Sequence, residues 1–479
     1  MTDIDAQPPG WGALLGGRNG LLSLALAGGV ALHAINVYIT TTILPSVVAD
    51  IGGIDYYSWN TSLFIVASIL AAAVSPGLLA RCGPRAAYLL SAVIFAAGSL
   101  ACGFAPSMAA MLAGRIVQGV GGGFLLALSY AMIRIVFDEA LWPRGIALVS
   151  GMWGVATLVG PAVGGLFAEY GLWRASFWAL APAAVVFGVL ATLALPPRDA
   201  APGSTGAGST GAGGAPMLQI LLLTAAVMAI SAGSVMTSAW ANAAGALVAI
   251  VLVCLIAVIE QSASRRLLPS GSFSPGGALG AVYASMMLLS IMVTSSEIFI
   301  PLFLQTLHGQ TPLVAGYLAA AMSAGWTLGS IGGAGATGAR MRRQLRFAPL
   351  PGLIGMVMLA ILVPPGSSGS WLALAPLCAA MLMVGVGVGL AWPHLLTRVL
   401  QLAPEGEEAV ASASLTTVQL FATAAGAALA GMVVNLAGLT SPGGAAGTAA
   451  AALWLFGVFS VAPLLCLFTV RRAMRNGGR

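Results

Sequence analysis

The chain has 479 residues, of which 59% are hydrophobic and only 7% are charged. A soluble globular domain carries about 25% charged residues, so this composition excludes that class and indicates a polytopic membrane protein. All 19 basic residues are arginine, and a phosphate-binding P-loop needs a lysine, so the chain cannot carry a nucleotide motor of that kind.

The net charge of +6 does not indicate a nucleic-acid partner, because the arginines are scattered in short loops between apolar segments. That distribution is typical of membrane orientation. We expect no metal site, because the five cysteines lack the spacing of metal ligands and most sit in apolar runs. They are Cys82, Cys102, Cys254, Cys378 and Cys466.

The first part of the chain predicts a six-helix bundle over 21–195. Residues 1–20 form a polar tail without the features of a secretory signal, so the first apolar segment is expected to remain as a span. Segments of about 20 apolar residues can cross the hydrocarbon, and they occur at 21–49, 57–80, 86–105, 108–136, 145–168 and 174–195. A Gly/Ser-rich stretch, 196–216, then predicts a flexible linker.

The second part predicts a two-helix insertion over 217–260, a loop over 261–275, a second six-helix bundle over 276–470 and a tail over 471–479. The insertion comprises 217–238 and 241–260. The later spans are 276–304, 312–338, 347–364, 371–397, 409–438 and 447–470. The predicted fold is therefore all-α with fourteen spans; if the insertion lay on the membrane surface, the number would be twelve.

Charge asymmetry predicts that both termini are cytoplasmic. In that orientation the outward loops contain only Arg174, and the inward loops and tail contain nearly all the other arginines. This is a strong positive-inside pattern, and we expect a multi-pass protein of a bacterial cytoplasmic membrane. Two six-span halves around a linker are typical of transporters whose substrate site lies between the halves near mid-membrane.

The fifth span contains Gly160-Pro161-Ala-Val-Gly164-Gly165. Proline kinks a helix and the glycines allow close approach of another helix, so this segment predicts a bend and a tight contact. The pattern resembles the antiporter signature of exporters in the major facilitator superfamily, which implies a conformational gate. The alternative is a kink that the membrane helix merely tolerates.

The fourth span places Arg115 and Gln118 on one helical face. A buried arginine is costly unless it is paired or hydrated. The motif resembles the arginine motif of drug:proton antiporters in the same superfamily, which implies a part in proton coupling. The alternative is a structural arginine that binds backbone carbonyls.

The loop between the second and third spans keeps Arg81, Gly83 and Arg85 of the family's loop motif, with Ala80 where the family has aspartate. In the family this loop latches the two halves on the cytoplasmic side. The alternative is a turn flanked by positive-inside arginines.

The first span places His33, Asn36 and Thr40 on one face, which is more polar surface than lipid accepts. We interpret them as cavity lining, against a structural network between helices. The fourteen-span branch of the family usually has an aspartate where Asn36 stands. Asparagine cannot titrate, so the proton site must lie elsewhere.

Glu297 is the only acidic residue well inside an apolar segment. Apolar surroundings favour the protonated form of a carboxyl group, so we expect Glu297, together with Arg115, to couple transport to protons. The alternative is a static ion pair between these two residues.

The resemblance to the fourteen-span drug:proton antiporters extends over nearly the whole chain. It implies a monomeric exporter of small, amphipathic organic compounds that works by alternating access, uses the proton gradient and needs no cofactor. Gln118, Met292, Trp392 and His394 complete the expected substrate cavity. A proton symporter or uniporter of the same fold is the main alternative.

An enzyme is not expected, because His33, His308 and His394 are on separate segments and form no ligand cluster. A channel is not expected either, because no ring of like charges is evident.

Overall fold

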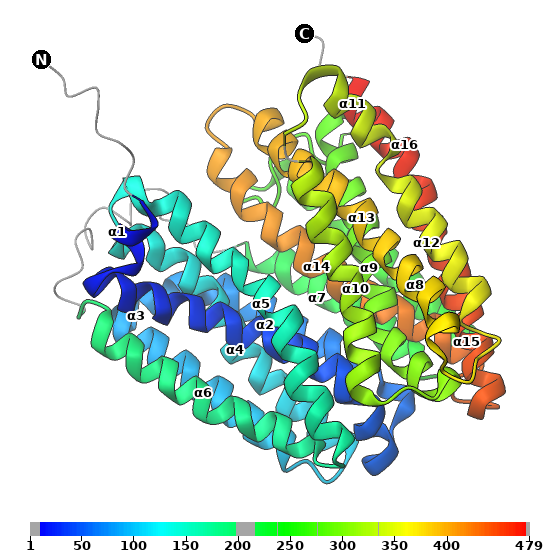
Figure 1. Ribbon diagram of the computed structural model, residues 1–479. Coiled ribbons are helices and arrows are strands. Elements are labelled where there is room, and N and C mark those ends of the chain that lie inside the picture. The colour runs from blue at the N-terminus through cyan, green and yellow to red at the C-terminus, as the bar shows by residue number, and fades with distance from the viewer. Residues whose placement is uncertain (1–9, 198–215, 237, 275, 334, 476–479) are drawn as a thin grey trace, which may run out of the picture. The chain divides into compact units, whose positions relative to one another are not determined.

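The computed structural model describes residues 10–197, 216–236, 238–274, 276–333 and 335–475, and the regular structure of these residues is helical (Figure 1). Most of the predicted linker 196–216 lies outside the described residues, as do the first nine residues and the last four.

The first six α-helices account for the spans predicted before the linker. A short α1 precedes the long α2, and 3-10 turns introduce α3 and α5. Their bounds are α1 Trp11–Leu15, α2 Gly17–Ile51, η1 Ile54–Tyr56, α3 Trp59–Gly103, α4 Met108–Val136, η2 Glu139–Leu141, α5 Trp142–Glu169 and α6 Trp173–Ala194.

The remaining helices follow the linker. They are α7 Met217–Ser234, α8 Ala239–Ser262, α9 Ala278–His308, α10 Pro312–Gly333, α11 Gly338–Phe347, α12 Pro349–Leu362, α13 Trp371–Leu402, α14 Glu408–Leu436, α15 Gly444–Phe459 and α16 Val461–Arg475. The predicted span 447–470 is divided between α15 and α16, and α11 lies in the segment predicted as a loop between the spans 312–338 and 347–364.

Among the described residues, 12 helical segments are long and apolar enough to cross a membrane. One of them contains two predicted spans, because α3 breaks at Gly83, which has φ 73° and ψ 172°. The 22-residue α10 is a further helix of spanning length. Counting the halves of α3 separately and adding α10 gives the fourteen spans of the sequence prediction.

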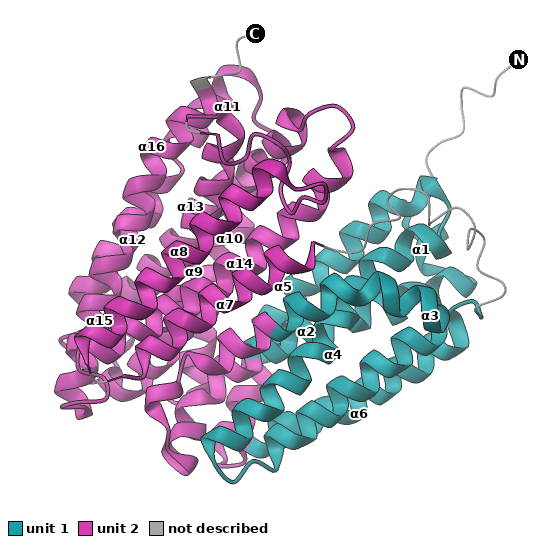
Figure 2. Ribbon diagram, turned by 180° about the vertical axis from the view of Figure 1, so that it is seen from behind, with its two compact units in different colours: residues 1–38, 67–160, 174–215 teal, residues 39–66, 161–173, 216–479 magenta. Residues whose placement is uncertain are grey.

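The chain divides into two compact units, shown in different colours in Figure 2. Unit 1 comprises 1–38, 67–160 and 174–215, and unit 2 comprises 39–66, 161–173 and 216–479. The boundary therefore falls within α2, α3 and α5, and in α5 it lies between Gly160 and Pro161. The two predicted bundles follow the chain order instead, so they stay a prediction.

Glycines bring α3 and α4 into close contact within unit 1. A Cβ added to Gly121 would lie 2.6 Å from the Cα of Phe95, and one added to Gly123 would lie 2.5 Å from the Cα of Ser68. The Ser68 hydroxyl also donates a 3.0 Å hydrogen bond to the Gly119 carbonyl. The glycine run of α4 is thus explained by helix packing, because any side chain there would meet backbone.

A second glycine contact joins α10 and α13 within unit 2. A Cβ on Gly329 would lie 2.7 Å from the Val386 carbonyl oxygen, and one on Gly385 would lie 2.7 Å from the Trp326 nitrogen. Because each helix contributes glycines that face backbone of the other, the pair packs without intervening side chains.

The predicted insertion forms the helical pair α7 and α8 of unit 2, and α7 also packs on α14. The indole nitrogen of Trp59 donates a 3.1 Å hydrogen bond to the Ser231 carbonyl near the end of α7. Much of α8 is exposed, including Leu247 at 60% and Val258 at 62%. The described residues of unit 2 therefore leave one side of α8 uncovered.

Candidate functional site

Arg115 is the largest fully buried side chain of the described residues, with 1% of its surface exposed. It lies seven residues into α4, about 10 Å from the start of the helix at a rise of about 1.5 Å per residue. A guanidinium group at this depth requires hydrogen-bond acceptors, since it remains charged at any physiological pH.

Two amide oxygens of unit 1 accept hydrogen bonds from Arg115. The Nη1 atom donates to Asn36 Oδ1 at 3.0 Å and to Gln118 Oε1 at 2.5 Å. Gln118 in turn donates to the Ser99 hydroxyl at 2.8 Å. The predicted face of Arg115 and Gln118 is thus joined to α2 and α3. Both of these acceptors are side-chain oxygens.

His33 lies one turn before Asn36 on α2 and is fully buried. Its ring packs edge-to-face on Trp153 of α5, with centroids 5.9 Å apart. Trp153 is not among the residues predicted from the sequence, since an aromatic residue in an apolar span carries no distinguishing pattern. Thr40, the third residue of the predicted face, is also buried at 1% exposure but belongs to unit 2.

Glu297 is half-buried in the interior of α9. The helix continues to His308, beyond the predicted end at residue 304, so Glu297 lies about 16 Å from that end rather than about 10 Å. The extra turn is held in place because the His308 ring makes hydrogen bonds to the Ser367 hydroxyl at 2.8 Å and the Val363 carbonyl at 3.1 Å.

The other residues predicted to line the cavity have defined surroundings within unit 2. Met292 is fully buried, and a Cβ on Gly352 of α12 would lie 3.0 Å from its sulfur. Trp392 packs edge-to-face on Trp326, with ring centroids 5.2 Å apart. His394 is 8% exposed. Met292 therefore fills space between helices, and its role as cavity lining stays a prediction.

The glycines of the fifth-span motif face two different helices. A Cβ on Gly164 would lie 3.1 Å from the Ile39 carbonyl oxygen of α2, whereas one on Gly165 would lie 2.5 Å from the Leu313 Cα of α10. Pro161 lies opposite α10 as well, 3.0 Å from the position of a Cβ on Gly316. The motif thus produces the tight contact that the sequence predicts.

The loop motif between the halves of α3 has one clear anchor. Gly83 occupies the left-handed region at φ 73°, which favours glycine. Arg85 donates a 2.5 Å hydrogen bond from Nε to the Leu195 carbonyl just after α6. Arg81 is exposed. Within unit 1 this loop therefore caps the end of α6, an interaction that basic residues commonly make with terminal carbonyls.

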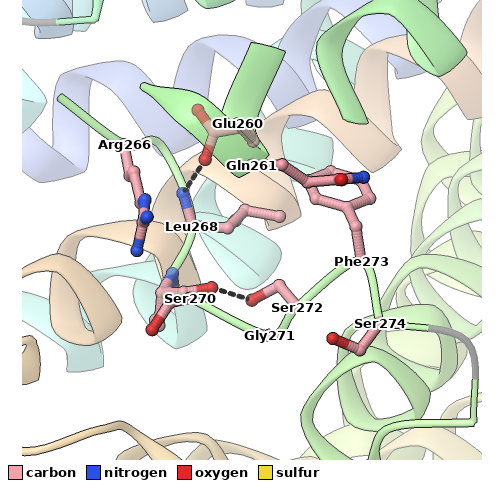
Figure 3. Close-up of a pocket in the computed structure, with 10 residues that line it drawn as sticks. Glu260, Gln261, Arg266, Leu268, Ser270, Gly271, Ser272, Phe273 and Ser274 are labelled. Carbon is pink, nitrogen blue, oxygen red and sulfur yellow. Dashed lines mark hydrogen bonds between the residues drawn. The ribbon is translucent and has the colours of Figure 1, made fainter. Parts of the chain in front are cut away.

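A separate polar cluster holds the segment between α8 and α9 and lines a cavity of about 250 Å³ (Figure 3). Glu260 is 5% exposed and accepts hydrogen bonds from the Leu267 and Leu268 amides at 2.9 and 3.1 Å. Arg266 forms a 3.1 Å ion pair with Glu407, which precedes α14. No group of three metal-ligating side chains occurs in the part of the chain that is described.

The sequence matches the model of the Major Facilitator Superfamily over residues 26–427. A probable multidrug-efflux transporter of Mycobacterium tuberculosis is 38% identical, and the match covers 98% of both chains. Multidrug resistance protein 3 of Bacillus subtilis is 23% identical over 76% of this chain and 70% of that protein.

Solved structures share the fold at low sequence identity. A POT family transporter in complex with a thioalcohol-conjugated peptide aligns with a TM-score of 0.66 and 13% identity, over 95% of this chain and 97% of that one. A D-xylose–proton symporter aligns with a TM-score of 0.62 and 14% identity over the same shares. The family match, the full-length relative and the 12 apolar helical segments of spanning length among the described residues agree, and this multi-pass membrane protein belongs to the major facilitator superfamily.

Proposed function

We propose that the chain exports small, amphipathic organic compounds in exchange for protons, by alternating access. The full-length similarity to a probable multidrug-efflux transporter supports export. The proline- and glycine-containing motif of α5 supports exchange rather than symport, because it resembles the antiporter signature. A monomer in a bacterial cytoplasmic membrane, with both termini cytoplasmic and no cofactor, is part of the proposal.

The position of Glu297 carries the proposal of proton coupling. Among the described acidic residues, no other lies so far inside an apolar helix: eleven residues separate Glu297 from the end of α9, whereas Asp50 and Glu260 lie in the last turns of α2 and α8. A carboxyl group in such surroundings can exist in the protonated form and release its proton when water reaches it. One carboxyl group that binds and releases a proton is sufficient to couple export of the substrate to entry of protons.

The cluster around Arg115 supports a site for polar groups of the substrate, and a part of Arg115 in proton coupling belongs to the same proposal. Arg115, Asn36 and Gln118 hold a buried charge in a defined position through neutral amides. Polar groups buried in a membrane protein are costly and are typical of substrate and proton pathways. We assign the cavity-lining role to this cluster and to His33, with Thr40, Met292, Trp392 and His394 as further candidates.

Reconstitution into liposomes with an imposed pH gradient tests the function. The purified protein should move an amphipathic cationic dye against its gradient when protons flow the other way, and movement of dye together with protons would instead identify a symporter. Transport that ignores the pH gradient would identify a uniporter.

The same assay tests the proton site with a matched pair of variants. Glu297→Gln should abolish gradient-driven transport and leave dye exchange partly intact, because the neutral amide mimics the permanently protonated form. Glu405→Gln makes the same chemical change on an exposed loop and should behave as the unmodified protein. Unchanged gradient-driven transport in Glu297→Gln contradicts the assignment.

A further inference from the structure

A cleft of about 580 Å³ opens beside α11 and α12 of unit 2 and combines two arginines with an apolar wall. Arg340 and Arg343 of α11 line one part of it. The side chains of Phe347, Leu350, Ile354 and Leu390 line the rest. None of the residues that line this cleft is acidic, and the sequence has no acidic residue between Glu297 and Glu405.

The arginines of α11 are presented outward because the opposite face of the helix is anchored. Leu345, on that opposite face, is 4% exposed. Gln344 lines the cleft one turn after Arg340, and its side chain donates a 3.4 Å hydrogen bond to the Leu390 carbonyl of α13. Arg340 and Arg343 are exposed and three residues apart, so they lie on the same side of the helix. The cleft thus presents two guanidinium groups side by side.

Helix length places these arginines at the membrane boundary. The 14 residues of α12 are about 21 Å long and cannot cross a hydrocarbon core of about 30 Å. The backbone remains helical at Ala348, with φ −53° and ψ −36°, so α11 continues the span. A membrane span needs about 20 residues. A span of that length that ends at Leu362 begins at Arg343.

The apolar wall continues along the outer surface of α12. Ile354, Val357 and Ile361 are 48%, 43% and 64% exposed and follow one another at helical spacing. In a membrane protein such a stripe faces acyl chains. The cleft therefore joins a site for a phosphate group to a surface for a hydrocarbon chain.

We propose that this cleft binds one anionic phospholipid from the leaflet on the α11 side. Its phosphate lies between Arg340 and Arg343, whose planar guanidinium groups suit phosphate oxygens. One acyl chain follows Phe347 and Ile354 along α12. A soluble phosphate compound would leave the apolar wall uncovered, so the lipid matches the whole cleft and the free anion matches only part of it.

Native mass spectrometry of the purified protein in detergent tests this proposal, with phosphatidylglycerol and phosphatidylcholine as probes. The unmodified protein should retain one phosphatidylglycerol at lipid concentrations where phosphatidylcholine does not bind. Arg340→Gln with Arg343→Gln should weaken phosphatidylglycerol binding by about 30-fold, from the usual effect of two interfacial arginines. Equal retention of the two lipids would overturn the proposal.

Arg342→Gln with Arg472→Gln is the matched control, because both residues are exposed and neither lines the cleft. This pair removes the same charge and should leave binding nearly unchanged. Equally weakened phosphatidylglycerol binding in both double variants would mean that the arginines attract the lipid only through overall charge. That result would overturn the proposed site. Displacement of the lipid by an equal concentration of glycerol phosphate would overturn it in favour of a free phosphate. If the double variant does not fold, the single variants Arg340→Gln and Arg343→Gln provide the same test, each with about 5-fold weaker binding.

Discussion

Gly165 and Leu313 meet backbone to backbone: a Cβ added to Gly165 would come within 2.5 Å of the Leu313 Cα. The contact joins the second half of α5 to the first turn of α10 inside unit 2. A residue larger than glycine therefore fits at position 165 only if one of the two helices moves. Under the proposed exchange cycle, this is where we expect a gate that must open and close.

Gly165→Leu should separate α5 from α10 and stop transport, although the protein still inserts into the membrane. Overpacking of this kind costs about 1–3 kcal/mol, which is enough to shift a conformational equilibrium at least several-fold. Spin labels at Leu172 and Gly309, both in unit 2, should report a longer distance in the variant.

Gly154→Leu is the control for this variant, because a Cβ at Gly154 has no atom within 4 Å. It should retain transport and the original distance between the labels. Gly165→Leu could instead lose transport while the distance between the spin labels stays the same. In that case the glycines of α5 serve only general packing, and the gate prediction is wrong.

Asn36→Leu should destabilise the protein because it removes an acceptor from the buried guanidinium of Arg115. A hydrogen bond to a charged group contributes about 1.5–3 kcal/mol, so we expect a clearly lower thermal unfolding temperature in detergent. Asn36→Asp keeps an acceptor 3.0 Å from Arg115 Nη1 and adds an opposite charge, so it should be at least as stable as the unmodified protein. Equal losses in both variants would show that the side-chain volume matters and the hydrogen bond does not.

Glu260→Ala should loosen the segment between α8 and α9. Glu260 is the acceptor for the Leu267 and Leu268 amides, and loss of the partner of a buried group costs about 1–3 kcal/mol. Amide hydrogen exchange over 263–274 should therefore become about tenfold faster or more. Glu405→Ala, on an exposed loop, should not change exchange in this segment. No acceleration in Glu260→Ala would mean that other contacts hold the loop.

The turn between α7 and α8 should face the outside of the cell, given the predicted cytoplasmic termini. A phosphatase that is active only outside the cytoplasm, fused after Ser238, should be active, whereas the same fusion after Arg266 should be inactive. Inactive fusions at both positions would show that this pair does not cross the membrane as two spans.

The positions of most helices could be predicted because hydropathy alone defines them. The segment predicted at 108–136 is α4, Met108–Val136, and the one at 174–195 is α6, Trp173–Ala194. Polar turns at helix ends were missed: α9 runs to His308 because tertiary hydrogen bonds hold its last turn. The whole of α11 was missed, since a helix with four arginines gives no hydropathy signal.

The candidate site could be predicted residue by residue but not as an arrangement. Helical spacing placed Arg115 beside Gln118, a pair separated by three residues. The hydrogen bond from Arg115 to Asn36 joins positions 79 residues apart, and no local pattern reports such a contact. Likewise, glycines in α5 predicted a close helix neighbour, but only the structure identifies Leu313 for Gly165 and Ile39 for Gly164.

The glycine contact between α10 and α13 has a mechanical consequence. Helices that meet through backbone atoms have no side-chain rotamers between them to absorb a displacement, so the two should behave as one stiff beam. Gly316, near one end of α10, touches Thr42 and Pro161, while Trp392 and His394 lie toward the other end of α13. A displacement of α10 at Gly316 should therefore move Trp392 and His394 as well. The rigidity of this helix pair comes from glycines, the residues that have no side chains.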